Sequence, residues 1–215
     1  FFLGPRSSNG KSTLLDVFAC LFYASVVSSL QPKDWKPNEF MVESMQYSRL
    51  NKVDDMSYQR ISDTGPFKSI TAGEKMTVNK KYEKPVNMYF TASHAFNGNK
   101  LFIMDEDSDA AARRLIVIQF LNKFTTDPDK VDPETRTYLV DPNIFDNIIN
   151  SEDEKEGLGA WAIAGALRFF ENEEKYTIVP SSEVILEQWR RRCSSAYEFM
   201  ITMIKHSNKK LYVSD

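Results

Sequence analysis

The sequence predicts an α/β fold in which a central parallel sheet is flanked by helices and followed by a C-terminal helical subdomain. The first observation is that the apolar residues 1–3 enter a glycine-containing turn, which leads into an apolar helix from about Lys11. The second is that residues 86–92 and 114–120 form short apolar runs between polar segments, as buried strands do. The third is a change to helical periodicity beyond residue 136.

The remaining elements of the N-terminal part follow in chain order. Residues 48–55, with the sequence SRLNKVDD, predict a strand that ends in two acids. Residues 68–84 alternate around a glycine turn, which is typical of a β-hairpin. Residues 122–136 are polar, contain Pro128 and Pro133, and are interpreted as a linker.

The C-terminal part is predicted to be helical. Apolar side chains recur there at the spacing of one helix face: Leu158, Trp161, Ala162, Gly165 and Phe169. Ser151 and Glu154 fit a capping box at the start of this helix, and a second helix is expected after Pro180. We therefore divide the chain into a core at residues 1–121 and a linker with a helical extension at residues 122–215.

Composition excludes several protein classes. With 42% hydrophobic and 13% aromatic residues, the 215-residue chain has enough apolar side chains for a packed core. The net charge of −3 excludes a uniformly basic nucleic-acid-binding chain, so any DNA contact must use a local patch. Two distant cysteines and two histidines argue against a zinc site or a disulfide scaffold and favour a reducing compartment such as the cytoplasm.

No membrane span or signal peptide is predicted. The most apolar run, residues 14–27, is too short to cross a bilayer and contains Asp16. The chain lacks an initiating Met, begins within an apolar run and ends on LYVSD, so we expect it to be a piece of a longer polypeptide.

The stretch GPRSSNGKST at residues 4–13 has the composition of a phosphate-binding loop, but with one more residue between the glycines than the usual Gly-x-x-x-x-Gly-Lys-Ser/Thr spacing. A lysine at the start of a helix places an ammonium where phosphate charge accumulates, and the helix N-terminus adds positive potential. Lys11 is therefore predicted to bind the β- and γ-phosphates of a nucleotide, and Ser12 to bind Mg²⁺. The rest of the cradle is predicted to comprise Gly4, Ser8, Asn9, Gly10 and Thr13. A surface turn that only caps a helix is the simpler alternative.

Hydrolysis of a nucleoside triphosphate also requires acids at a strand end, which hold Mg²⁺ and polarise the attacking water. Two pairs compete for this role: Asp54 with Asp55 after LNKV, and Asp105 with Glu106 after KLFIM. The second pair follows the more apolar run. Periodicity alone leaves the choice open.

Basic residues cluster at two places. Arg113 and Arg114 precede an apolar strand, where an arginine can reach the γ-phosphate of a neighbouring subunit; an ion-paired or solvated pair is the alternative. The hairpin segment carries lysines near Tyr82, and cations beside an aromatic ring suit the backbone of a single-stranded nucleic acid, although a lysine cluster is often only a solvated face. These lysines are Lys75, Lys80, Lys81 and Lys84.

Taken in order, these segments resemble the superfamily-3 helicases, in particular the primase-helicases of poxviruses, phages and plasmids. GPRSSNGKSTLL is similar to their Walker A motif and RLNKVDDMS to their Walker B motif, which ends in paired acids. FKSITAGEKMTVNKKYEKP is similar to the segment that runs into their basic hairpin, and VNMYFTASHAFN to their sensor strand. DSDAAARRLIVIQF is similar to their arginine-finger block, and EKEGLGAWAIAGALRFF to the helix after it.

The resemblance implies a P-loop NTPase core of the AAA+ type with ATP and Mg²⁺ as ligands. It implies that Asp54 and Asp55 are the Walker B acids and that Asp54 holds the metal together with the loop serine. It also implies that Arg113 and Arg114 act as arginine fingers between subunits. The sensor position, which in the family is an Asn after an apolar run, is matched to Ser93.

The function implied by the resemblance is that of an ATP-dependent replicative DNA helicase. Such proteins form homo-oligomeric, usually hexameric rings that translocate on single-stranded DNA, and an N-terminal primase module is expected on the full-length chain. An ATP-binding ring or scaffold with weak hydrolysis and little unwinding is the alternative, motivated by the loop spacing and by Ser93. A small-molecule kinase that uses the same loop is a third hypothesis.

Overall fold

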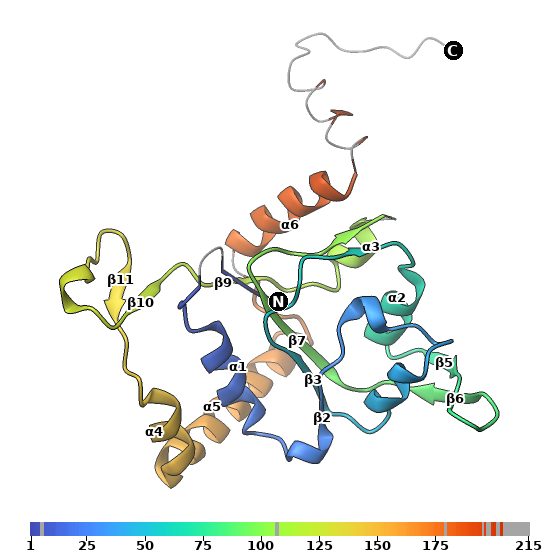
Figure 1. The fold of residues 1–215 in the computed structure, drawn as a ribbon, viewed down its shortest axis with the longest axis horizontal. Coiled ribbons are helices and arrows are strands. Elements are labelled where there is room, and N and C mark those ends of the chain that lie inside the picture. Colours follow the sequence, from blue (N-terminus) through green and yellow to red (C-terminus); the bar gives the residue numbers. More distant parts are fainter. Residues whose placement is uncertain are drawn as a thin grey trace.

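The computed structural model confirms the α/β class (Figure 1). It describes residues 1–4, 7–105, 108–178 and 180–194, together with residues 196, 199, 200 and 203. A parallel sheet lies at the centre of the molecule, and helices flank it.

Five strands form the central sheet in the order β2-β3-β7-β1-β9, and each neighbouring pair is parallel. The strands are β1 (Phe2–Leu3), β2 (Val27–Ser28), β3 (Leu50–Val53), β7 (Ser93–Gly98) and β9 (Ile118–Gln119). Because the strands are parallel, the loops that follow β1, β3 and β7 leave from the same edge of the sheet. We call this the carboxyl edge and the opposite one the amino edge.

Both faces of this sheet are covered, as parallel sheets require. Phe1 and Phe2 point to opposite faces because side chains alternate along an extended chain. On one face the ring of Phe2 lies 6.0 Å from that of Phe18 in helix α1 (Lys11–Ala19), which contacts β3 and β7. Phe1 joins the main apolar core on the other face, whose largest members are Trp35, Phe67, Phe90, Phe96, Phe102 and Trp189.

Helix α6 (Pro180–Cys193) confirms the helix expected after Pro180 and closes part of the core. Trp189 is 3% exposed and donates its indole N–H to the carbonyl of Phe102. The hydroxyl of Ser182 accepts a hydrogen bond of 3.1 Å from the backbone N–H of Val117. The C-terminal part of the chain therefore contributes side chains to the same core as the sheet.

Three smaller strand pairs surround the central sheet. They are the parallel pair β4 (Arg60–Ile61) and β8 (Ile103–Met104), the antiparallel pair β5 (Lys75–Val78) and β6 (Val86–Tyr89), and the parallel pair β10 (Lys123–Thr125) and β11 (Thr137–Leu139). The shorter helical elements are η1 (Ala24–Val26), η2 (Pro32–Asp34), η3 (Phe40–Met45), α2 (Gly65–Thr71), α3 (Ser108–Ala112) and η4 (Pro128–Lys130). The segment interpreted as a linker thus contains β10 and η4, while the division into two domains stays a prediction.

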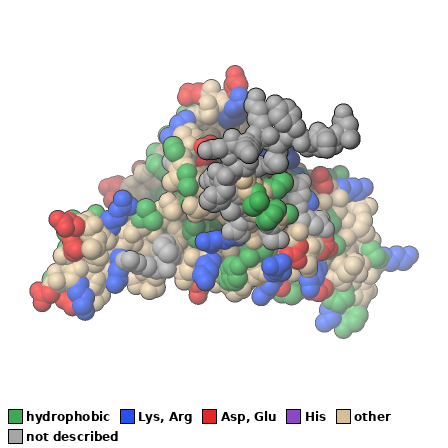
Figure 2. Space-filling view, turned by 90° about the horizontal axis from the view of Figure 1, so that it is seen from above, with side chains coloured by type: hydrophobic (Ala, Val, Ile, Leu, Met, Phe, Trp, Pro, Cys, Tyr) green, Lys and Arg blue, Asp and Glu red, His purple; other side chains and the backbone are tan. Residues whose placement is uncertain are grey.

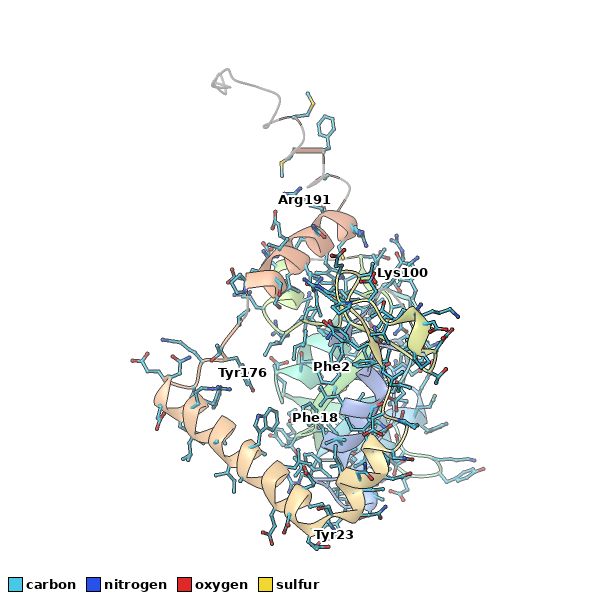
Figure 3. The ribbon with its side chains drawn as sticks, turned by 90° about the vertical axis from the view of Figure 1, so that its left-hand side faces the viewer. Phe2, Phe18, Tyr23, Lys100, Tyr176 and Arg191 are labelled. Carbon is cyan, nitrogen blue, oxygen red and sulfur yellow. The ribbon has the colours of Figure 1, made fainter. Side chains whose placement is uncertain are left out.

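Helices α4 (Ile144–Asn150) and α5 (Glu152–Glu171) follow β11. The capping box is confirmed on its serine side, because Ser151 Oγ accepts a hydrogen bond of 3.3 Å from the backbone N–H of Glu154. No residue of the predicted apolar face of α5, which lies within the described part of the chain, is fully buried, but the ring of Trp161 stacks on that of Phe18 with 5.6 Å between ring centres. Figure 3 shows α5 along the side of the molecule, with Phe18 between the sheet and this helix.

The strand predicted at residues 48–55 is confirmed as β3, and the run at residues 86–92 contains the strand β6, but this strand lies outside the central sheet. β6 pairs with β5 in a hairpin, and the strand of the central sheet begins only at Ser93. An apolar run shows that a segment is partly buried, but it does not identify the strand with which it pairs. The apolar run 114–120 contributes only the two residues of β9 to the sheet.

The surface carries no single dominant charge on the face seen in Figure 2, where Lys and Arg side chains are interspersed with acidic and apolar ones. This agrees with the net charge of −3. Among the described residues, none of the helices has the length and apolar character needed to span a membrane.

Candidate functional site

The loop between β1 and α1 lies at the carboxyl edge of the sheet and begins with two close backbone contacts. Gly4 donates its N–H to the carbonyl of Gly98 at 3.2 Å. A Cβ on Gly4 would lie 1.8 Å from Asn9 Nδ2, so a larger residue here would displace the Asn9 side chain. Gly10 has φ of 80° and precedes the first residue of α1, a conformation that glycine adopts without strain. Two residues of the extended spacing between the glycines, Pro5 and Arg6, lie outside the described residues.

Lys11 is the first residue of α1, and its side chain is buried in the loop with 7% of the residue exposed. Its Nζ donates to Asn9 Oδ1 at 2.8 Å, to Asn99 Oδ1 at 3.3 Å and to the carbonyl of Gly4 at 3.5 Å. Burial lowers the pKa of Lys11, and the charge of Asp55 opposes that shift. The loop therefore surrounds a desolvated ammonium with neutral oxygens, which an anion can replace.

Asn97, near the end of β7, joins the loop to the acids that follow β3. It is 1% exposed, and its Nδ2 donates to Asp54 Oδ1 at 2.9 Å and to Ser12 Oγ at 3.3 Å. Its Oδ1 accepts from the backbone N–H of Asp55 at 2.7 Å. The side-chain nitrogen of Asn97 thus donates to both the hydroxyl and the carboxylate that are predicted to bind the metal.

Ser12 and Asp54 fit Mg²⁺ by chemistry, because a hydroxyl and a carboxylate are the hard oxygen ligands that this ion takes beside water and phosphate. Lys52 on β3 competes for the carboxylate: its Nζ lies 2.8 Å from Asp54 Oδ2 and also pairs with Asp16. Burial of Lys52 opposes its charge, but the hydrogen bonds to Asp16 and Asp54 outweigh burial and raise its pKa. Within the described part of the chain, no group of three or more His, Cys, Asp or Glu side chains could hold a metal ion by itself.

The competing acid pair lies elsewhere. Asp105 follows β8, which pairs with β4 outside the central sheet, and its carboxylate pairs with Arg60. Glu106 lies outside the described residues. The geometry therefore brings Asp54 and Asp55, and not Asp105, to the loop that carries Lys11.

Three other predicted residues lie together at the amino edge, away from Lys11. Ser93 is the first residue of β7 and not its last, so its match to the end of the sensor strand is wrong in position. Arg113 and Arg114 are exposed and precede β9. All three line a cavity of about 1090 Å³ that also reaches His94 and Arg190.

Asn97 is the residue that sequence reasoning missed. The segment SHAFNG does contain an Asn after apolar residues. The sensor position was nevertheless matched to Ser93, because the strand was predicted to end at residue 92. Lys52 and Asn99 were missed as well, because only the folded chain shows that they lie beside Asp54 and Lys11.

A basic hairpin is present, but it is displaced from the predicted residues 68–84: β5, β6 and the loop at residues 79–85 form it, and the predicted glycine turn at Gly73 instead follows α2. Tyr82 at its tip is 94% exposed, and Lys81 Nζ lies 5.1 Å from the centre of its ring. Lys80 forms an ion pair with η3: its Nζ lies 3.1 Å from Glu43 Oε1, and this hydrogen bond raises the pKa of Lys80. Lys75 and Lys84 are exposed.

Comparisons with known proteins identify one family and a larger set of distantly similar structures, of which two are described below. The model of a family of unknown function, DUF5906, matches residues 2–114. The A form apo structure of the NrS-1 C-terminal region has 19% sequence identity and a TM-score of 0.47, over 72% of this chain and 34% of that one. A second A form apo structure, of the NrS-1 C-terminal region 305–718, has 19% identity and a TM-score of 0.42, over 63% of this chain and 31% of that one.

The chain spans about a third of the length of these two structures. No curated protein matches it significantly. The family model, by contrast, covers more than half of the chain, from β1 through α3, and includes Lys11, Asp54 and Asn97. On this match, the chain belongs to the family of unknown function DUF5906.

Proposed function

We propose that this chain is the ATPase domain of a superfamily-3 replicative DNA helicase, which binds ATP and Mg²⁺ at the β1–α1 loop and translocates on single-stranded DNA as a homo-oligomeric ring. The observation that carries the proposal is the cluster at the carboxyl edge, where Asn97 bridges Ser12 and Asp54 beside the buried Lys11. The order of the motifs along the chain supports the assignment to a helicase, with a primase module expected N-terminal to it.

In this proposal Lys11 exchanges its bonds to Asn9, Asn99 and Gly4 for bonds to phosphate oxygens. The N-terminus of α1 adds positive potential at the same place. Mg²⁺, when held by Ser12 and Asp54, would neutralise phosphate charge. Asp55, whose backbone N–H is held by Asn97 beside Asp54, is the carboxylate that we assign to orient the attacking water.

The substitution Lys11→Ala tests this site. It removes the buried ammonium, so Mg²⁺-dependent ATP hydrolysis should fall to near background while the circular dichroism spectrum stays unchanged. Lys100→Ala is the matched control, because Lys100 is an exposed lysine of the neighbouring β7–β8 loop. This variant should hydrolyse ATP at the wild-type rate. Full turnover in Lys11→Ala would show that hydrolysis does not use this loop.

The helicase part of the proposal needs two further measurements on the wild-type chain. Single-stranded DNA should stimulate ATP hydrolysis, and a forked duplex should be unwound in the presence of Mg²⁺ and ATP. The alternative is an ATP-binding ring or scaffold with weak hydrolysis. One observation favours it: Lys52 Nζ lies 2.8 Å from Asp54 Oδ2, where its positive charge opposes metal binding. ATP binding without stimulation by DNA and without unwinding would select this alternative.

A further inference from the structure

The short ribbon of β10 and β11 lies against the β1–α1 loop (Figure 1). Phe124 of β10 donates its backbone N–H to the carbonyl of Ser8 at 2.7 Å. Just before β10, the carbonyl of Phe120 accepts a hydrogen bond of 3.3 Å from Asn9 Nδ2. The segment that was interpreted as a linker therefore fixes one side of the loop.

The ring of Phe124 lies directly beside the glycine that precedes Lys11. A Cβ built on Gly10 would be 3.5 Å from Phe124 Cε2, which is ordinary van der Waals contact. Phe124 itself is half-buried, and its partner in the ribbon register, Tyr138, is 38% exposed with its ring centre 6.4 Å away. Two partly exposed aromatic rings thus stand at the border of the loop.

The strand order places Phe124 and Tyr138 on the opposite side of the loop from Ser12 and Asp54, the predicted metal ligands. β1 has β7 on one side and β9 on the other. Ser12, Asp54 and Asn97 meet on the β7 and β3 side of the loop. A triphosphate whose terminal phosphate and metal lie there has its nucleoside end toward the other side, where β9 continues into β10.

We propose that Phe124, with Tyr138 beside it, is the stacking face for the base of a bound nucleoside triphosphate. This inference rests on the proposed nucleotide-binding function of the loop and adds the place of the base. Stacking on an aromatic ring uses the π-face that every base has, so ATP and GTP should depend on Phe124 to a similar degree.

The test compares two ligands that share the phosphates and differ in the base. Isothermal titration calorimetry with Mg²⁺ measures the Kd of ATP and of inorganic tripolyphosphate for the wild type, for Phe124→Ala and for Phe124→Trp. Phe124→Ala should weaken ATP roughly ten- to a hundredfold and leave tripolyphosphate within about twofold. Phe124→Trp should retain ATP affinity, and Phe40→Ala, an exposed phenylalanine on η3, is the control that should change neither.

The outcomes separate this inference from the proposal on which it rests. If Phe124→Ala leaves ATP affinity unchanged, or weakens ATP and tripolyphosphate equally, Phe124 supports only the loop and the base site is wrong. If the wild type binds tripolyphosphate but gains nothing from the base of ATP, the loop binds phosphate and the base site is again wrong. If the wild type binds neither ligand, the nucleotide-binding function fails and the base site fails with it.

Discussion

Asn97 is a buried side chain that makes hydrogen bonds to three groups from two other parts of the chain. A buried amide with its donors and acceptor satisfied fixes the positions of its partners, because breaking any of these bonds leaves a desolvated polar group. Asn97 therefore sets the distance between the loop hydroxyl of Ser12 and the acids after β3. Its role is to position these groups rather than to react.

Substitution of Asn97 should therefore weaken use of the metal more than binding of the nucleotide. Asn97→Ala is expected to lower ATP turnover about ten- to a hundredfold, as loss of a group that orients metal ligands does, and to raise the Mg²⁺ concentration needed for half-maximal turnover. Titration of Mg²⁺ at saturating ATP measures both. Asn147→Ala, an exposed asparagine on α4, is the control. An unchanged Mg²⁺ requirement in Asn97→Ala would contradict the positioning role.

His94 lies at the amino edge with its ring centre 4.6 Å from that of Trp35, and burial lowers its pKa from 6.5 to about 4. Between these two pH values the unfolded chain binds a proton that the folded chain does not, so stability is full above pH 6.5 and falls as the solution is acidified toward pH 4. The loss from this group amounts to at most about 3 kcal/mol.

The substitution His94→Phe keeps an aromatic ring against Trp35 and removes the titration. Urea unfolding at pH 7 and at pH 4.5 should therefore show a smaller loss of unfolding free energy in the variant than in the wild type. Carboxylates titrate in both proteins, so their contribution to the loss of unfolding free energy is the same and cancels in this comparison. Equal losses in the two proteins would mean that His94 is protonated freely in the folded chain.

At the scale of elements, the β5–β6 hairpin shows which features the sequence pattern predicts and which it does not. Alternation and the lysine cluster predicted a basic hairpin at residues 68–84; the hairpin forms at residues 75–89, because residues 65–71 are helical. The pattern did not reveal that Lys80 is ion-paired with Glu43, since η3 lies about 40 residues earlier in the chain. The lysines at the tip consequently differ in how readily they can meet a phosphate.

If the hairpin binds single-stranded DNA, Lys81→Ala with Lys84→Ala should weaken binding and reduce the slope of log affinity against log salt by about 1.4, roughly 0.7 for each lost phosphate contact. Lys80→Ala alone should have a smaller effect, because Glu43 already neutralises this lysine. Fluorescence anisotropy with a labelled oligonucleotide at several salt concentrations measures the slope. An unchanged slope in the double variant would place the DNA contact elsewhere.

At the scale of the whole molecule, the sheet separates the predicted catalytic residues into two groups. Register pairs Phe2 with Ile118, so Arg113 and Arg114 lie before the amino end of β9, whereas Lys11 follows the carboxyl end of β1. Within one chain the two arginines are thus at the opposite edge from the loop. If they act in hydrolysis, they act on the nucleotide of a neighbouring copy.

Mixing experiments test this action between copies. Arg113→Ala or Arg114→Ala should lower ATP turnover in assembled rings, and doping either variant into wild type should reduce turnover more than in proportion to the variant fraction, because each variant subunit also impairs its neighbour. Arg168→Ala, on α5, is a control for loss of an arginine elsewhere. A strictly linear decline with variant fraction would argue against an arginine that acts between subunits.

The sequence by itself determined the α/β class, the strand that precedes Asp54 and the helices after residues 151 and 180, because these follow from local periodicity, turn residues and capping. It also indicated Lys11 and Ser12, whose position at the start of a helix is a local property. Only the tertiary structure decided that β7 begins at Ser93 and ends near Asn97, and that Arg113 lies away from Lys11. It alone also brought Phe124 to the loop. The physical reason is that pairing in the central sheet joins residues 23 to 116 positions apart, and no local pattern records which pairs will form.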